Sequence, residues 1–320
     1  MMKRAFVFTV IVLVLLSNFN SCLQTSKLTT DTESSSTPAI VVSTTNSTSE
    51  SPPEQVSIPT PPIQPHTFPV EELNVHFIDV EQGDSILIDM GRIEILIDGG
   101  DRSPGVVPYL KTYVDEPIEF LVATHPHADH IGGLISVLEE FDVKEIWHNG
   151  DINPTKTYED FMVAVQSENA PVHIAKLHDT IKAGELSLYV HNPSNISDSI
   201  NNNSIVLHLA YGDTDFLFMG DAEKEAEGAM MMLSSVRVPE VEVLKVGHHG
   251  SRTASSKDFL AITNPKLAVY MAGIDNRYGH PHEETIRALN EIGAKIYGTD
   301  MHGTIIVTSN GDSYSITTEK

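Results

Sequence analysis

One ten-residue stretch, THPHADHIGG at Thr124–Gly133, gathers the residues best suited to chemistry. It holds His125, His127, Asp129 and His130 within six positions. Neutral imidazoles and carboxylates are the ligands that divalent Zn, Mn and Fe prefer, and short spacing lets several donors converge. The stretch therefore predicts a metal site, because three histidines and an aspartate at this spacing are hard to explain as incidental residues of a solvated loop.

The sequence on either side of this stretch predicts how it is held. An apolar run, Ile118–Ala123, comes before it and is typical of a buried strand. An apolar-periodic run from Leu134 to Leu138 comes after it and is typical of a helix. We therefore expect the four polar residues on a tight loop between a strand and a helix, with the helix N-terminus anchoring the loop.

Further candidate ligands follow later apolar runs. Asp221 ends the stretch FLFMGD and stands next to Gly220. A bridging carboxylate is needed to hold two cations about 3.5–4 Å apart, and Asp221 is the natural candidate. The stretches VGHHGS and YGHPH add four histidines, which are His248, His249, His280 and His282.

A weak internal repeat relates Ser85–Asp98 to Ser204–Asp221. Each segment begins Ser-Ile, forms an apolar strand, turns at a glycine, forms a second apolar strand and ends with Asp beside Gly. A helix-like stretch, another apolar strand and histidines follow each segment. The repeat predicts two βαβ-like halves packed face to face, with both sets of polar residues emerging at one edge.

These motifs resemble a known family. The His/Asp cluster resembles the signature of the metallo-β-lactamase superfamily. The motifs DVEQGDS, DGG, THPHADHIGG, NNNSIVL, MGD, KVGHHGS and YGHPH together resemble the hydrolase domain of ComEC-like competence proteins and related secreted hydrolases, including the teichoic-acid phosphorylcholine esterases. The resemblance implies an α/β (α+β) fold over residues 71–320, a four-layer αββα sandwich with two pseudo-symmetric halves. The chain departs from the family at Glu81, where Gly is usual, so the loop beside the site is bulkier and more acidic.

The resemblance also implies ligand sets for two metals bridged by Asp221. In one set, His248 completes a site begun by His125 and His127. In the other, His280 or His282 completes a site begun by Asp129 and His130. We prefer His282, because His280 in Gly-His-Pro is better placed to orient or contact substrate.

Four further residues receive expected roles. His249 finds no place among the ligands and is expected to contact substrate. Asp98 is expected to accept a hydrogen bond from a ligand histidine. The run Asn201–Ser204, above all Asn203 and Ser204, is a candidate for substrate binding, and the alternative is that these are turn and strand-edge residues.

A metal-dependent hydrolase follows from this resemblance. Two divalent ions, zinc first with manganese and iron open, would supply hydroxide from a bridging water and stabilise transition-state charge. Asp129 would orient the nucleophile or shuttle its proton, and His249 or His280 would contact a substrate oxygen. A phosphodiesterase, such as an extracellular nuclease acting on DNA, is the first hypothesis. The alternatives are a cell-envelope phosphocholine esterase, another amide or ester hydrolase such as a β-lactamase, and a non-catalytic surface binding protein.

The charge balance restricts the partners. With 20 Lys and Arg against 44 Asp and Glu, the formal net charge is −24. Such a chain lacks the basic surface that non-specific nucleic-acid binding requires, which weighs against long DNA. It does not exclude a small or polymeric phosphodiester held by metal ions in a cleft. We expect a monomer.

The N-terminus predicts export. Lys3 and Arg4 precede the apolar run Ala5–Leu16, as in a signal peptide over residues 1–21. The only cysteine, Cys22, resembles the lipid-attachment site of a bacterial lipoprotein; ordinary cleavage and an uncleaved anchor are the alternatives. Residues 22–70 are rich in Ser, Thr and Pro and predict a disordered linker. We therefore expect an extracytoplasmic protein, secreted or lipid-anchored to the cell membrane.

Overall fold

Two mixed β-sheets organise the computed structural model, which describes residues 71–193, 197–232 and 238–320. The predicted signal peptide, Cys22 and the 22–70 linker lie outside the described residues. Within the described part of the chain, no helix combines the length and apolar character needed to cross a membrane.

The first sheet has eight strands. Their order is β15 (Tyr314–Thr318), β14 (Ile305–Ser309), β1 (Leu73–Phe77), β2 (Ile86–Met90), β3 (Ile93–Ile97), β4 (Ile118–Ala123), β5 (Val143–His148) and β6 (Val172–Ile174). The predicted strand at Ile118–Ala123 is confirmed residue for residue as β4.

The second sheet has seven strands. Their order is β13 (Lys295–Gly298), β12 (Leu267–Tyr270), β11 (Val243–Lys245), β10 (Thr214–Phe218), β9 (Val206–Tyr211), β8 (Leu186–Asn192) and β7 (Thr180–Ala183).

Strand pairing confirms the internal repeat. In the first sheet the antiparallel hairpin β2–β3 is continued by the parallel strands β4, β5 and β6. In the second sheet the antiparallel hairpin β9–β10 is continued by the parallel strands β11, β12 and β13. The loops that follow β4 and β11 therefore occupy equivalent positions in the two halves.

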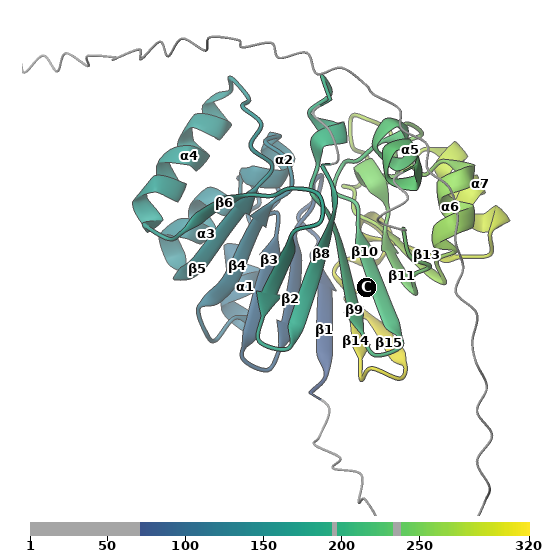
Figure 1. The fold of residues 1–320 in the computed structure, drawn as a ribbon, viewed down its shortest axis with the longest axis horizontal. Coiled ribbons are helices and arrows are strands. Elements are labelled where there is room, and N and C mark those ends of the chain that lie inside the picture. The colour runs from purple at the N-terminus through teal and green to yellow at the C-terminus, as the bar shows by residue number, and fades with distance from the viewer. Residues whose placement is uncertain (1–70, 194–196, 233–237) are drawn as a thin grey trace, which may run out of the picture. The chain divides into compact units, whose positions relative to one another are not determined.

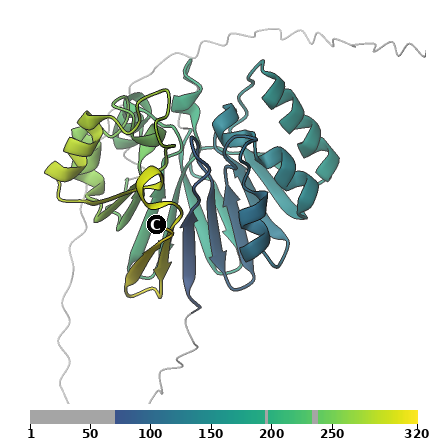
Figure 2. The same ribbon diagram turned by 180° about the vertical axis from the view of Figure 1, so that it is seen from behind.

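Helices cover the outer face of each sheet. The first sheet carries α1 (Val107–Tyr113), α3 (Leu134–Glu140) and α4 (Lys156–Glu168), and the second carries α5 (Lys224–Met232), α6 (Lys257–Thr263) and α7 (Glu283–Glu291). Figures 1 and 2 show α3 and α4 beyond one sheet and α5, α6 and α7 beyond the other. The shorter elements are α2 (Ala128–Ile131), α8 (Thr299–His302) and the 3₁₀ turns η1 (Asn201–Asn203) and η2 (Gly247–Gly250).

The strand sequences explain this four-layer αββα architecture. Side chains alternate between the two faces of a strand, and the central strands are covered on both faces, so β2, β3 and β4 are apolar at all but one position each. Ile86 and Ile88 join the core between the two sheets, where Phe216 and Phe218 also lie. Leu87 points the other way, into the core beneath α1 and α3. The predicted fold class is confirmed.

Candidate metal centre

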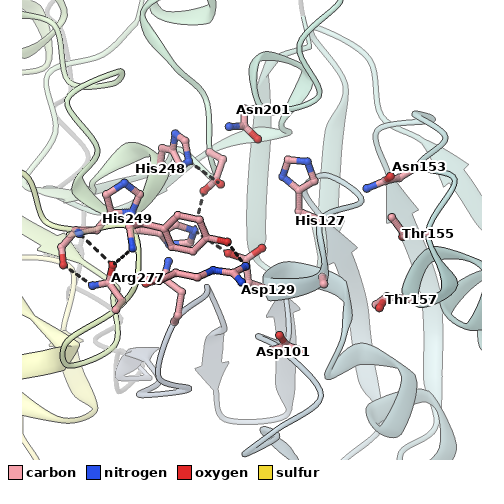
Figure 3. Close-up of a pocket in the computed structure, with 16 residues that line it drawn as sticks. Asp101, His127, Asp129, Asn153, Thr155, Thr157, Asn201, His248, His249 and Arg277 are labelled. Carbon is pink, nitrogen blue, oxygen red and sulfur yellow. Dashed lines mark hydrogen bonds and ion pairs between the residues drawn. The ribbon is translucent and has the colours of Figure 1, made fainter.

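The polar clusters of the two halves meet where loops leave the strands. The loop after β4 leads into α2, and the turn after β10 carries Asp221. The loop after β11 forms η2, which carries His248 and His249. Figure 3 shows His127 and Asp129 from the first half facing His248 and His249 from the second.

Asp221 lies at the centre of the cluster and is 2% exposed. Its Oδ1 atom lies 3.3 Å from His130 Nε2 and 3.3 Å from His249 Nε2. Its Oδ2 atom lies 3.6 Å from His125 Nε2 and 3.7 Å from His248 Nε2. The two oxygens of one carboxylate therefore face two separate sets of imidazole nitrogens.

The donor set suits a divalent metal. Two groups have donor atoms that all lie within 4.8 Å of one another: Asp84, His130, Asp221 and His249 form one group, and His125, His127 and Asp221 form the other. In the first group, four buried atoms have no hydrogen-bond partner, namely Asp84 Oδ1, His130 Nε2, Asp221 Oδ1 and His249 Nε2. Buried polar atoms normally find partners, so a cluster of such unpaired atoms fits a cation held between them.

Hydrogen bonds orient His130 from behind. Its Nδ1–H donates to Asp98 Oδ2 at 2.8 Å. The same carboxylate accepts hydrogen bonds from the backbone amide and the hydroxyl of Thr124 at 2.8 and 2.7 Å. The structure thus brings Asp98 to the position expected of it, where it fixes the ring so that Nε2 points toward Asp221.

Charge in the cluster shifts the histidine pKa values in opposite directions. Burial would lower the pKa of His130, but the carboxylates of Asp221 and Asp98 outweigh burial and raise it well above its usual value. Burial would also lower the pKa of His249, and Asp221 and Asp84 likewise raise it well above its usual value. At His125 burial dominates, and the pKa falls well below its usual value. His130 and His249 therefore favour their protonated forms, which supply the positive charge that a divalent cation would otherwise supply. Metal binding would displace these protons.

Two backbone features bring the loops together. His248 and His249 both adopt left-handed conformations, with φ of 47° and 54°. Gly83, with φ of 138°, lets the β1–β2 loop pass directly beneath the histidine loop, because a Cβ there would lie 2.3 Å from the Asp129 backbone oxygen. Left-handed residues other than glycine are uncommon, and they cluster at functional sites.

The structure corrects the expected placement of His249 and His282. His249, expected to have no place among the donors, has its Nε2 3.3 Å from Asp221 Oδ1 and 3.5 Å from Asp129 Oδ2. His282, the preferred donor, belongs to neither group of converging atoms among the described residues. It directly precedes α7, and its Nδ1 instead accepts a hydrogen bond from the Arg252 amide at 3.0 Å.

His248 and His280 lie beside the converging groups and outside them. His248 faces Asp221, while its Nδ1 lies 2.9 Å from Glu223 Oε1. The ring of His280 lies 5.3 Å from that of His248, and burial lowers the His280 pKa to about 4. The buried Nδ1 of His280 has no hydrogen-bond partner. The side chain is therefore neutral and able to accept or donate a hydrogen bond beside the cluster.

Asn203 and Ser204 are buried, which argues against the expected substrate contacts. Ser204 Oγ accepts a hydrogen bond from the Asp221 amide at 3.1 Å and lies 3.3 Å from His125 Nδ1. Asn203 uses its amide group within the protein, donating to Asp151 Oδ2 and to the Ser197 carbonyl. Both residues brace the site from behind, and it is Asn201 of the same run that lines the cavity.

Sequence reasoning missed Asp84 and Lys245. Asp84 lies between β1 and β2 and is 1% exposed, and Lys245 ends β11 and is fully buried. Their side chains form a direct ion pair. The sequence did offer one signal, because Lys245 interrupts a short apolar run, Val243–Val246, that is typical of a buried strand. A buried lysine is almost always paired with an acidic residue, so an acidic partner could have been expected.

A cavity of about 740 Å³ opens over the cluster (Figure 3). Most of the described residues that line it are of polar or charged types, and Arg277 is the only lysine or arginine among them. Those residues are Gln82, Asp101, His127, Ala128, Asp129, Asn153, Thr155, Thr157, Asn201, Asp221, His248, His249, Asn276, Arg277, Tyr278 and His280.

Comparison with known proteins agrees with this geometry. A family model described as the metallo-beta-lactamase superfamily matches residues 78–273. The chain is 30% identical over 257 residues to ComE operon protein 3 of Bacillus subtilis, covering 73% of this chain and 33% of that protein. It is 28% identical over 249 residues to Recombination protein 2 of Haemophilus influenzae, covering 76% of this chain and 29% of that protein. The chain thus spans about a third of the length of these relatives.

One solved structure aligned with the fold is that of Igni18, described as a novel metallo hydrolase from Ignicoccus hospitalis. The alignment has a TM-score of 0.49 and 13% identity, and it covers 73% of this chain and 98% of that one.

Proposed function

The chain belongs to the metallo-β-lactamase superfamily and is a metal-dependent hydrolase. On this premise, we propose that it cleaves phosphodiesters with the help of two divalent metal ions. One ion would be held by His130, His249 and Asp221, which belong to one converging group, together with Asp129, whose Oδ2 lies 3.5 Å from His249 Nε2. The other would be held by His125, His127 and Asp221, with His248 beside them. Zinc is our first choice, and manganese and iron bind the same donors. Bound there, the metals supply a hydroxide nucleophile at neutral pH and offset negative charge in the transition state.

The phosphodiester assignment rests on one observation, which is that Arg277 lines the cavity. The side chain is exposed, lines the cavity, and lies over the Tyr278 ring at 4.7 Å. A guanidinium group binds the oxygens of a phosphate in two parallel hydrogen bonds. Together with two divalent cations, it makes this cavity attractive to an anionic ester despite the net charge of −24.

The loop that carries Arg277 is held in place by Asn276. The Asn276 Oδ1 atom accepts hydrogen bonds from the amides of Tyr278 and His280, at 3.2 and 3.0 Å. Its Nδ2 group donates to the carbonyls of Gly273 and His280. Arg277 is therefore presented from a fixed turn at the edge of the cavity.

Two residues have positions suited to moving protons. Asp129 lines the cavity, and its pKa is lowered: burial opposes this, but the neighbouring His249 and His130 outweigh it. Its carboxylate is therefore ionised and able to orient the attacking water by accepting a hydrogen bond from it. His280, neutral and with an unpaired buried Nδ1, is suited to hydrogen-bond a substrate oxygen.

The assignment is tested with the full chain loaded with zinc or manganese. We expect hydrolysis of bis-p-nitrophenyl phosphate, and a loss of roughly 100-fold or more in kcat/KM for Asp129→Asn and Asp221→Asn. Asp258→Asn, an exposed change on α6, is the matched control and should keep full activity. Turnover of nitrocefin without turnover of the phosphodiester would overturn the assignment in favour of amide hydrolysis.

A phosphocholine esterase is the second candidate, and Tyr278 and Asp101 favour it. A carboxylate attracts a quaternary ammonium group, and Asp101 lines this cavity. Tyr278 lines it too, and its ring adds a cation–π contact where the ammonium group replaces Arg277, which lies over the ring at 4.7 Å. The acidic surface disfavours long DNA but not a choline ester. Comparing p-nitrophenyl phosphocholine with single-stranded DNA as substrates separates this candidate from a nuclease.

We also propose that the protein acts outside the cytoplasm, as a monomer that is secreted or lipid-anchored. The support is the charged and apolar N-terminal sequence followed by Cys22. Metabolic labelling with a fatty acid should mark the wild-type chain and not Cys22→Ala. Labelling of neither, together with cytoplasmic fractionation, would contradict the proposal.

A further inference from the structure

Lys245 is an unusual residue to find in the core of this protein. It ends β11 in the second sheet and is fully buried. Its ammonium group forms an ion pair with Asp84 and also donates to the Gly220 carbonyl at 3.1 Å. Burying an ammonium group is costly unless it is paired and hydrogen-bonded, so these contacts define where Lys245 must lie.

Asp84 belongs to the other half of the molecule and lies behind the histidines. It follows β1 in the first sheet. Its Oδ1 lies 3.2 Å from His249 Nδ1, and its Oδ2 lies 4.0 Å from His130 Nδ1. Both histidines point the opposite nitrogen, Nε2, toward Asp221.

The Nδ1 atoms of the two histidines already have hydrogen-bond acceptors. His249 Nδ1 donates to the Met271 carbonyl at 3.0 Å, and His130 Nδ1 donates to Asp98. Asp84 Oδ1 forms no hydrogen bond of its own despite its proximity to His249. Asp84 thus acts on His249 through charge and packing, and Lys245 is the cation that compensates it.

We propose that Lys245 and Asp84 are positioning residues, an ionic link between the two sheets that aligns the two halves of the metal centre. Through Gly220, Lys245 fixes the turn that carries Asp221. Through Asp84, it fixes the ring of His249 against His130. The inference rests on the proposed metal centre but not on phosphodiester cleavage, so it is tested without a substrate.

The competing role for Asp84 is direct metal ligation, because one of its oxygens lies within 4.8 Å of the other donors. The two roles differ in a double variant. A positioning pair can be replaced as a unit by neutral residues of similar shape, whereas removal of one partner leaves the other as a buried unpaired charge. A ligand cannot be replaced in this way.

The experiment compares Lys245→Met, Asp84→Asn and the double variant in the full chain. Zinc per chain, zinc affinity by competition with a chelator, and the melting temperature are measured for each. The exposed pair Lys257–Glu291 supplies the matched control, as Lys257→Met with Glu291→Gln. The ¹⁵N shifts of the His249 ring, assigned by comparison with His249→Gln, report its tautomer and environment.

We expect each single variant to melt roughly 10 °C lower and to bind zinc at least tenfold more weakly. The double variant should regain most of the melting temperature and hold two zinc ions per chain, with wild-type-like His249 signals, while its zinc affinity should stay a fewfold below that of wild type because methionine at position 245 cannot donate to the Gly220 carbonyl. Single variants that match wild type would overturn the proposal. A double variant that melts normally but holds one zinc fewer would also overturn it and make Asp84 a ligand.

Discussion

Replacement of His249 by alanine tests the proposal that His249, rather than His282, is a metal ligand. His249 Nε2 is one of two imidazole nitrogens 3.3 Å from Asp221 Oδ1, and it also faces Asp129 at 3.5 Å. Its loss removes a direct donor from one metal position and leaves these two carboxylates with one fewer cationic neighbour. Loss of a residue that only supports a ligand weakens metal binding 10–100-fold. We therefore expect His249→Ala to weaken one site by at least about 100-fold, or about 2.8 kcal/mol.

The assay is metal content after dialysis against a buffered zinc concentration that saturates wild type tenfold. His249→Ala should retain one zinc per chain. His282→Ala is the matched control, because it also removes a partly buried histidine near the site, yet its Nδ1 contacts only the Arg252 amide. It should retain two. If His282→Ala loses a zinc ion while His249→Ala keeps both, the geometric reasoning is refuted.

Three further changes test the surroundings of the site. Asp98→Asn should weaken zinc binding 10–100-fold in calorimetry, because the new amide group cannot accept every hydrogen bond that the carboxylate accepts; unchanged affinity would contradict its orienting role. Burial lowers the His76 pKa to about 4 from 6.5, so the unfolded chain takes up a proton first as pH falls. The folded state should therefore lose about 1–2 kcal/mol between pH 7 and pH 5, a loss that His76→Gln should lack in urea titrations; equal pH slopes would be inconsistent with this. Gly83→Ala should destabilise by roughly 2 kcal/mol or more in thermal melts, whereas Gly228→Ala on α5, with open space around it, should stabilise slightly.

Much of the fold could be predicted because its signals are local. The run Ile118–Ala123 coincides with β4 and is apolar except at Glu119, since a strand covered on both faces is mostly apolar. The repeat between the two hairpins predicted two similar halves, and strand pairing confirms it. The motifs likewise brought His130 and Asp221 to one cluster, because the connections that leave β4 and β10 carry them and emerge at the same edge of the fold.

The remaining part of the site depends on features that spacing does not report. Two consecutive histidines in the left-handed conformation turn His249 inward, and nothing in the letters HHG reveals those positive φ angles. Asp84 and Lys245 are far apart in sequence and meet only because the two sheets pack together. Asn203 is the last residue of η1 and is buried, and hydrogen bonds to Asp151 and Ser197 occupy its amide. Each of these outcomes is decided by tertiary packing.

The four hydrogen bonds made by the Asn276 side chain have a thermodynamic consequence for recognition. They order the loop that carries Arg277 and Tyr278 before any ligand arrives. The conformational entropy of that loop is therefore lost during folding and is not lost again on association. A ligand of matching shape gains the full enthalpy of its contacts, and a poorly matched one cannot reshape this wall of the cavity. The rigid loop then makes the cavity selective because it excludes ligands that do not fit. A variant such as Asn276→Ala would bind a broader range of ligands, each with lower affinity.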